Sequence, residues 1–266
     1  MTDNDIPVVM TFAGTDPTGG AGIQADIEAI SSMGCHAAAV VTAVTVQDTR
    51  DVIGFEPVSG ALVIEQARAV LEDMPVHAIK IGMIGSVENV EVIHTLLNDY
   101  PDIPVVLDPI LLAGGGSELA DDELMRAMID LLFPMTSILT PNSQEARRLA
   151  PEADSLDACA QEILSAGCEL VLITGTHENT TTVDNILYGN RRRLETYSWE
   201  RLPHSYHGSG CTLSSGIAGL LAQGMEPLTA IHEAQEYTWE TLKHGYRLGM
   251  GQYHPNRFFW ARGEEE

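Results

Sequence analysis

Basic residues, and lysine above all, are scarce in this sequence. Its 266 residues include 14 Lys or Arg against 38 Asp or Glu, a formal net charge of −24, and Lys80 and Lys243 are the only lysines. Nucleic acids and anionic membrane surfaces bind proteins through clustered positive charge, and the short basic run at 191–193 is too small to supply it. The composition therefore argues against nucleic-acid and membrane partners.

Cysteine motifs and long apolar runs are also missing. The four cysteines, Cys35, Cys159, Cys168 and Cys211, form no CxxC pair and show no metal-ligand spacing, so we expect free thiols. No apolar run approaches the ~20 residues that cross a bilayer. The acidic start of the chain lacks the basic segment of a secretory signal, so we expect a cytoplasmic protein.

Strand-like and helix-like segments alternate along the chain. Short apolar runs predict strands at 8–13, 36–46, 78–84, 104–110, 137–140 and 170–174. Helical spacing separates them at 23–33, 61–74, 87–100, 121–133 and 155–166, and further helices are expected at 211–223 and 227–246. A hairpin is expected at 184–188 and 193–199 with Gly189 and Asn190 between its strands, and part of the tail after Gly251 is expected to be mobile. The alternation predicts one α/β domain over 1–266, with helices on both faces of a mainly parallel sheet.

Glycine and polar residues gather where these predicted strands end. Ligands of open α/β sheets bind outside the carboxyl ends of the strands, so residues at these ends are expected to share one site. The residues concerned are Gly14, Gln47, Met83, Asp108, Asn142 and Thr174.

The segment His207-Gly208-Ser209-Gly210-Cys211-Thr212 directly precedes a predicted apolar helix. Glycines allow successive backbone N–H groups to converge, and a helix N-terminus adds partial positive charge, which suits a transferring phosphoryl group. The same position is expected to lower the pKa of Cys211, so that its thiolate accepts a substrate proton. A plain helix cap with a buried cysteine is the alternative interpretation.

A second glycine-rich segment, 14–22, follows the first predicted strand and opens a helix that carries Asp26. Its fit to the dinucleotide fingerprint is poor, because Thr15, Asp16 and Pro17 follow Gly14. Asp26 is a candidate ligand contact over the strand ends, and the alternative is a solvated carboxylate that complements the helix dipole.

Two further sets of residues suggest ligand chemistry. Gln47 offers a donor and an acceptor to the edge of a heteroaromatic ring, against which Met83 is able to pack. Asp108 and Glu145 are candidates to hold Mg²⁺ through water, while Asn142 positions phosphate oxygens. The alternatives are a core methionine and two solvated carboxylates.

Six segments of the chain, in this order, resemble the hydroxymethylpyrimidine/phosphomethylpyrimidine kinases of thiamin biosynthesis. They are AGTDPTGGAGIQADIEA, VTAVTVQDT, KIGMIGS, VLDPI, LTPNSQEA and HGSGCTLSSGIAG. Six ordered motifs over nearly the whole chain are far more specific than one glycine loop. The resemblance implies a ribokinase-like three-layer αβα sandwich. It also implies transfer of the γ-phosphoryl group of ATP, with Mg²⁺, to 4-amino-5-hydroxymethyl-2-methylpyrimidine and then to its monophosphate.

The resemblance also implies roles for the matching residues. Asp26 and Gln47 would contact the pyrimidine, with Met83 and Gly14 lining its pocket. Gly208, Ser209, Gly210 and Cys211 would form the anion hole, and Cys211 stands where related sugar kinases carry an aspartate base. Asn142 and Glu145 would serve Mg²⁺ and phosphate, with Asp108 and Thr174 on the same side. Family members are commonly homodimers, so the resemblance implies a homodimer here too.

The chain departs from the family pattern at two places. It has Thr174-Gly175-Thr176-His177 where many members have Lys-Gly-Gly-His, and Gly114-Gly115-Gly116 where they have Lys-Ser-Gly. Both changes remove a lysine near the expected nucleotide phosphates. We therefore expect weaker ATP binding or a stronger dependence on Mg²⁺, with activity retained.

Three other functions remain open from the sequence. The first is a pyridoxal-type kinase, against which Cys211 in place of Asp argues. The second is an acyl-transfer enzyme with a Cys211 nucleophile, for which His207 lies too close in sequence to be a convincing base. The third is a pyrimidine-binding protein without turnover.

Overall fold

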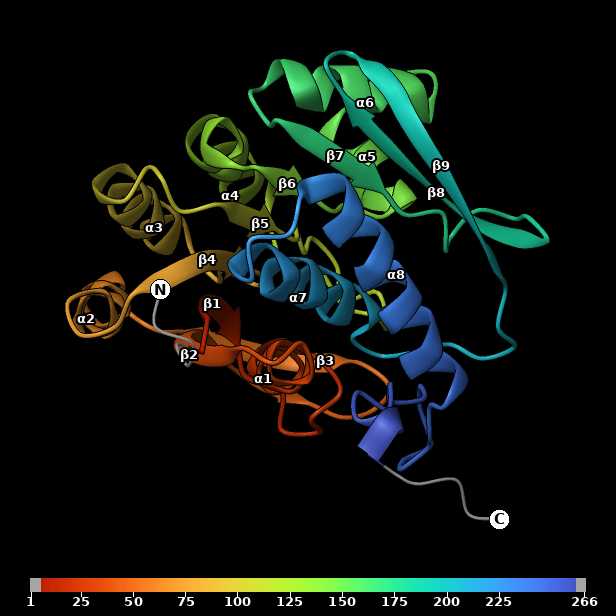
Figure 1. The fold of residues 1–266 in the computed structure, drawn as a ribbon, viewed down its shortest axis with the longest axis horizontal. Helices are drawn as coiled ribbons and strands as arrows, with labels where there is room; N and C mark the ends of the chain where they lie inside the picture. The colour runs from red at the N-terminus through yellow and green to blue at the C-terminus, as the bar shows by residue number, and fades with distance from the viewer. Residues whose placement is uncertain (1–5, 262–266) are drawn as a thin grey trace.

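One twisted sheet of nine strands runs through the protein (Figure 1). The computed structural model describes residues 6–261, and the strand order is β3-β2-β1-β4-β5-β6-β7-β8-β9. The strands are β1 Val8–Gly14, β2 His36–Gln47, β3 Val52–Pro57, β4 Val76–Ile81, β5 Val105–Leu107, β6 Ile138–Leu139, β7 Leu170–Ile173, β8 Thr182–Gly189 and β9 Arg192–Glu200. In this order, the neighbouring strands from β2 to β7 pair in parallel, whereas the β2–β3, β7–β8 and β8–β9 pairs at the two edges are antiparallel. The predicted mainly parallel sheet is confirmed.

Helices cover both faces of this sheet and complete the predicted three-layer sandwich. One layer contains α1 Gly22–Ser32, α7 Ser209–Ala222 and α8 Pro227–Lys243. The other contains α2 Gly60–Leu71, α3 Val87–Asp99, α4 Asp122–Ala127, α5 Ser143–Leu149 and α6 Leu156–Ser165. Within residues 6–261, no helix combines the length and apolarity that a membrane span requires.

Strand β1 shows how the sequence produces two cores. All seven of its residues are buried, as expected for a central parallel strand. Successive side chains point to opposite faces, so Val9 joins the core beneath α1, α7 and α8, while Met10 and Phe12 join the core beneath the other helices.

The structure adds two elements that the sequence patterns did not predict. Strand β3 extends the sheet beyond β2, although Gly54 and Pro57 weaken its strand signal. Helix α5 has Asn142 as its N-cap, and Asn142 and Glu145 form a reciprocal capping box. Residues 128–135 continue α4 as a turn of π-helix and a 3₁₀ turn in place of one regular helix.

The β8–β9 hairpin is confirmed, with its turn shifted by one residue. Gly189 belongs to β8, and the turn is made by Asn190 and Arg191, whose φ angles are 50° and 57°. Two consecutive left-handed residues suit the right-handed twist of a hairpin.

The tail after Gly251, part of which was expected to be mobile, packs against the body of the protein as far as Ala261. Arg257 is 2% exposed and His254 is buried too. The backbone carbonyl of Arg257 accepts hydrogen bonds from Ser32 Oγ at 2.9 Å and from the Tyr237 hydroxyl at 3.0 Å. The final glutamates, 264–266, lie outside the described residues.

A fully buried ion pair lies between the sheet and the helix layer of α1 and α7. Lys80 Nζ on β4 donates to both carboxylate oxygens of Asp26 on α1, at 2.9 and 3.0 Å, and both side chains are 0% exposed. The hydroxyls of Thr11 and Ser215 also donate to Asp26, at 2.6 and 2.8 Å. Burial alone would lower the pKa of Lys80, but the neighbouring Asp26 above all raises it above its usual value, so the ammonium stays charged. Asp26 is therefore neither a solvated carboxylate nor available to a ligand.

We expect Asp26→Asn to lower the free energy of unfolding by roughly 3–5 kcal/mol, since it leaves the Lys80 charge buried without its partner. The double variant Asp26→Asn/Lys80→Met should recover most of this loss. Urea unfolding curves measure both, with Arg50→Gln, which breaks the exposed Arg50–Asp48 pair, as the control that changes little. A loss in Asp26→Asn no larger than in this control would contradict the structural role of the pair.

Candidate active site

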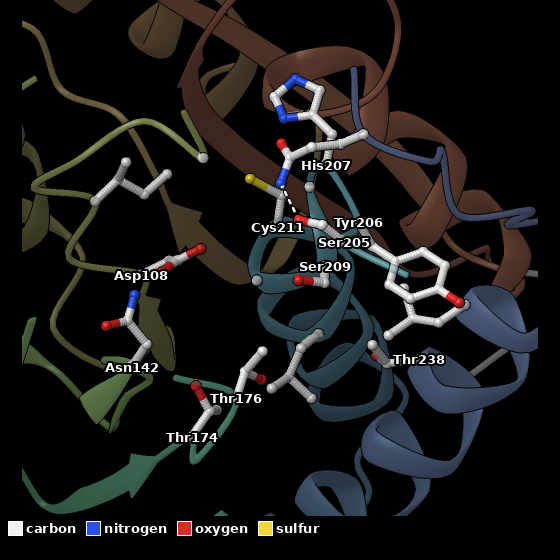
Figure 2. Close-up of a pocket in the computed structure, with 18 of the residues that line it drawn as sticks. Asp108, Asn142, Thr174, Thr176, Ser205, Tyr206, His207, Ser209, Cys211 and Thr238 are labelled. Atoms are coloured by element: carbon white, nitrogen blue, oxygen red, sulfur yellow. Dashed lines mark hydrogen bonds between the residues drawn. The ribbon is translucent and has the colours of Figure 1, made fainter. Parts of the chain in front are cut away.

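A cleft of about 520 Å³ opens at the carboxyl ends of the parallel strands. Figure 2 shows Asp108 and Asn142 on one side and Cys211 and Ser209, at the start of α7, on the other, with Thr174 and Thr176 below. All but one of the predicted site residues line this cleft. They are Gly14, Gln47, Met83, Asp108, Asn142, Glu145, Thr174, Gly208, Ser209, Gly210 and Cys211.

Asp26 is the exception, and its predicted contact with a substrate is corrected by the structure. Its side chain lies behind the wall of the cleft, with both carboxylate oxygens bonded to Lys80. The spacing within α1 placed Asp26 near the strand ends, but it did not reveal that this face of the helix turns toward β4. Asp26 can affect the cleft only through the groups it holds.

The first turn of α7 points into the cleft. Gly208 is its N-cap with φ of 78°, a left-handed conformation, and a Cβ at this position would overlap the carbonyl oxygen of Gly20. Among residues 6–261, the N–H groups of Ser209, Gly210 and Cys211 have no hydrogen-bond acceptor, as expected for the first turn of a helix. Three unpaired donors at a helix N-terminus provide a site for a phosphoryl group.

A hydrogen bond between Asp16 and His207 holds the two glycine-rich segments together. Asp16 is 0% exposed, and its Oδ2 lies 2.8 Å from His207 Nε2, one residue before Gly208. Burial alone would raise the pKa of Asp16, but hydrogen bonds from His207, Thr18 and Ala21 lower it to about 2. The carboxylate is therefore ionised near neutral pH and holds the anion-binding turn in place.

Arg257 reinforces this junction from behind the cleft. Its Nε donates to Thr212 Oγ1 at 2.9 Å, and its guanidinium donates to the carbonyl oxygens of Gly19 and Gly20. It also pairs with Glu28 at 3.1 Å. Sequence patterns missed Arg257 because nothing in the tail suggested that it folds back onto the first glycine-rich segment.

The predicted lowering of the Cys211 pKa is wrong for this structure. Complete burial raises the pKa of the thiol to about 12, and the nearby Lys80 ammonium only partly opposes this effect. The carboxylates of Asp108 and Asp26 raise it further. The N-terminus of α7 surrounds Cys211 with backbone dipoles, but desolvation of the thiolate is the larger effect.

Two buried carboxyl groups stand across the cleft from α7. Asp108 is 5% exposed and accepts a 3.4 Å hydrogen bond from Ser214 Oγ of α7, while Glu145 is 6% exposed. Burial raises the pKa of both groups, and for Glu145 the nearby Asp108 adds to the effect. Glu145 Oε2 also accepts from the Asn142 N–H at 2.9 Å, so this carboxyl group caps α5 as well. These hard oxygen ligands fit a divalent cation.

The far end of the cleft is aromatic. Trp199 of β9 and Trp239 of α8 stack with their ring centroids 6.3 Å apart, and both line the cleft beside Thr238. The sequence suggested only packing for Trp239.

Basic side chains are nearly absent from the described cleft wall, where Arg201 is the only lysine or arginine. Its guanidinium is occupied by hydrogen bonds to the carbonyl oxygens of residues 176, 178, 180 and 182. Anion binding therefore depends on backbone donors and on any bound cation.

Comparison with known proteins supports one family. The family model described as phosphomethylpyrimidine kinase matches residues 16–256. The chain is 32% identical over 263 residues to the hydroxymethylpyrimidine/phosphomethylpyrimidine kinase of Staphylococcus aureus, covering 97% of this chain and 95% of that protein. It is also 36% identical over 247 residues to the thiamine biosynthesis bifunctional protein ThiED of Geobacter sulfurreducens, covering 91% of this chain but only 50% of that longer protein.

Solved structures show the same fold. Phosphomethylpyrimidine kinase from Clostridium difficile superimposes with a TM-score of 0.77 at 33% identity, covering 90% of this chain and 100% of that one. An ADP complex of Bacillus subtilis pyridoxal kinase superimposes with a TM-score of 0.87 at 25% identity, covering 97% and 99%.

The Asp16–His207 contact predicts a pH-dependent stability. Because the pKa of Asp16 is lower in the folded protein, its ionised form stabilises the fold above the pKa of an unfolded aspartate, and this contribution is lost as pH falls toward 2. We therefore expect Asp16→Asn to be less stable than the wild type at pH 6, with a difference that narrows below pH 4. Urea unfolding at both pH values measures it, with the exposed Asp130→Asn as control. A difference that stays constant with pH would contradict the assignment.

Proposed function

This chain belongs to the phosphomethylpyrimidine kinase family, and we propose that it phosphorylates 4-amino-5-hydroxymethyl-2-methylpyrimidine and then its monophosphate, using ATP. The observation that carries the proposal is the first turn of α7, which presents three unpaired N–H groups to a cleft with two distinct ends. One end offers Gln47 and Met83 to a small heteroaromatic ring, and the other offers Trp199 and Trp239 to a nucleotide base. The phosphates would then meet the hydroxymethyl group at α7.

The transfer step forms one bond and breaks one. The hydroxymethyl oxygen bonds to the γ-phosphorus, the bond from that phosphorus to the β–γ bridging oxygen breaks, and ADP leaves. Negative charge on the transferring group is stabilised by the N–H groups of Ser209, Gly210 and Cys211. The Asp16–His207 bond and Arg257 keep this turn in position and do not touch the reacting atoms.

We propose that the thiolate of Cys211 receives the hydroxyl proton. Because burial raises the pKa of this thiol to about 12, only a small fraction is thiolate at neutral pH. A base with a raised pKa accepts a proton readily once it is formed, which favours transfer. At neutral pH, however, few molecules carry the thiolate, which limits the rate. The rate of transfer should consequently rise with pH as the thiolate population grows.

Magnesium fits the acidic side of the cleft. Within residues 6–261, no three acidic, histidine or cysteine side chains cluster tightly enough to enclose a metal, and Mg²⁺ usually needs only one or two carboxylates, with water and phosphates completing its shell. Asp108 and Glu145 would hold it, with Asn142 and Thr174 directed to the phosphates. Bound Mg²⁺ would neutralise phosphate charge, which matters here because the cleft lacks free basic side chains.

The remaining proposals concern the cell and the assembly. A cytoplasmic location agrees with the use of ATP and with four free, buried cysteines. A homodimer is supported by exposed apolar side chains on the β2–β3 edge, where Val44, Val46 and Ile53 are 54%, 60% and 76% exposed, with the exposed Glu56 paired opposite Val44. Two copies that each carry a charge of −24 repel each other, so a contact between them is expected to use apolar side chains of this kind.

The proposed reaction is tested by an ATPase-coupled assay with the hydroxymethylpyrimidine, its monophosphate and pyridoxal, with and without Mg²⁺. Turnover on both pyrimidines is the expected result, and turnover on pyridoxal alone would indicate a pyridoxal-type kinase.

The role of Cys211 as the base is tested by variants. Cys211→Ala should reduce kcat by roughly a hundredfold or more. The wild-type kcat should rise between pH 6 and 9, while Cys211→Asp should flatten this profile, because a carboxyl group ionises at lower pH than a thiol in the same surroundings. Cys168→Ala is the buried-cysteine control, and a flat wild-type profile would exclude Cys211 as the base.

The dimer is tested by sedimentation velocity. We expect Ile53→Glu to convert a dimer into a monomer, because it puts a charge into the apolar contact. Leu62→Glu, which changes a similarly apolar and 50% exposed residue on α2, should leave the dimer intact. A monomeric wild type, or a dimer that survives Ile53→Glu, would refute the assigned face.

A further inference from the structure

We propose that Thr45 makes this kinase selective for amino-substituted rings, by holding the Gln47 amide so that its carbonyl oxygen is the atom offered to the substrate. The inference rests on the proposed function and deepens it. Gln47 contacts the substrate ring, and Thr45 has a positioning role because it acts only through Gln47.

Two hydrogen bonds at the end of β2 fix the Gln47 side chain, and two more connect Thr45 with Thr15. Gln47 Nε2 donates to Thr45 Oγ1 at 2.7 Å and to the carbonyl oxygen of Thr15 at 3.2 Å. The Thr45 hydroxyl itself donates to the same Thr15 carbonyl at 2.7 Å. A further bond, from the Thr45 N–H to Thr15 Oγ1 at 3.2 Å, ties the two residues together. The amide is therefore held by the loop that follows β1.

The chemistry of these partners determines which way the amide faces. A backbone carbonyl can only accept, so the Gln47 atom beside Thr15 must be the donor, Nε2. The single proton of the Thr45 hydroxyl is used on the same carbonyl, which leaves its lone pairs to accept from Nε2. With the amide reversed, two carbonyl oxygens would face each other at 3.2 Å without a proton between them.

The other end of the amide is left for a ligand. Among residues 6–261, Gln47 Oε1 has no hydrogen-bond donor, while Gln47 lines the cleft. This side of the ring pocket therefore presents an acceptor. It pairs with a donor such as an exocyclic amino group and opposes an oxygen at the same ring position.

Among residues 6–261, no lysine or arginine beside Gln47 is free to reverse this preference. Lys80 is committed to Asp26 behind the wall, and the Arg50 guanidinium is paired with Asp48 on the exposed turn. The neighbouring parts of the wall include Gly14, Val52 and Met83, which have no side-chain donor, and Thr15, whose hydroxyl oxygen accepts from the Thr45 N–H. An oxo group or a phenolate oxygen placed against Gln47 Oε1 would thus lose its water without gaining a hydrogen bond.

The test compares kcat/KM for 4-amino-5-hydroxymethyl-2-methylpyrimidine with that for its 4-oxo analogue, which differs only at this ring position. For the wild type we expect the amino compound to be favoured by about a hundredfold, the scale of one unpaired polar group in a binding site. Thr45→Val keeps the shape of the side chain but removes the shorter of the two bonds that hold Gln47 Nε2, which leaves only the 3.2 Å bond to the Thr15 carbonyl, so the ratio should fall at least tenfold. Thr45→Ser keeps the hydroxyl and should restore the wild-type ratio.

Thr136→Val is the matched control. The Thr136 hydroxyl is also buried and donates to the Leu132 carbonyl at 2.8 Å, far from the cleft, so the variant is expected to lose stability and to keep the ratio. A ratio that is unchanged in Thr45→Val, or that falls equally in Thr136→Val, would overturn the positioning role. The wild-type ratio is an independent readout if Thr45→Val does not fold.

The same assay distinguishes a failure of the selectivity proposal from a failure of the proposed function. If the wild type phosphorylates the amino compound and its 4-oxo analogue equally well, the selectivity proposal is wrong and the proposed function stands. If it phosphorylates neither, the proposed function is wrong and the selectivity proposal falls with it.

Discussion

The buried pair between Lys80 and Asp26 is the interaction on which the site depends. It joins β4 to α1, and through Ser215 it also reaches α7, whose first turn lines the cleft. A buried ion pair is costly to form and costlier to break, because the remaining charge has no solvent. The same ammonium lies close enough to affect the pKa of Cys211 and Asp108, so this structural pair also sets the electrostatics of the candidate chemistry.

A second set of contacts joins the two glycine-rich segments into one unit. Asp16 bonds to His207, and Arg257 bonds to the carbonyls of the first segment and to Thr212 of α7. Gly208 needs its left-handed conformation because the carbonyl of Gly20 packs against it. Because Arg201 is the only lysine or arginine in the described cleft wall, any phosphate bound there would depend on the backbone donors of this unit and on a bound cation.

Much of the fold was predictable because parallel strands are buried on both faces and appear as apolar runs. The helix spacing between them predicted the layers, and the strand ends predicted most of the cleft wall. Strand β3 was not predicted because an edge strand carries a weaker apolar pattern, and this one contains Gly54 and Pro57. Helix α5 was not predicted although its capping residues, Asn142 and Glu145, are present in the sequence, because these two residues suggested a metal site instead.

The sequence by itself determined the family, the order of the elements and the edge of the sheet where the site lies, since these follow from local patterns and ordered motifs. Only the tertiary structure decided the contacts of Asp26, Thr45 and Arg257. Their partners are Lys80, Thr15 and Thr212, and apart from the loop–strand pair of Thr15 and Thr45 these contacts join residues far apart in the chain. Burial, which raises the pKa of Cys211 to about 12, is likewise a property of the packed molecule, because desolvation depends on every group that surrounds the thiol.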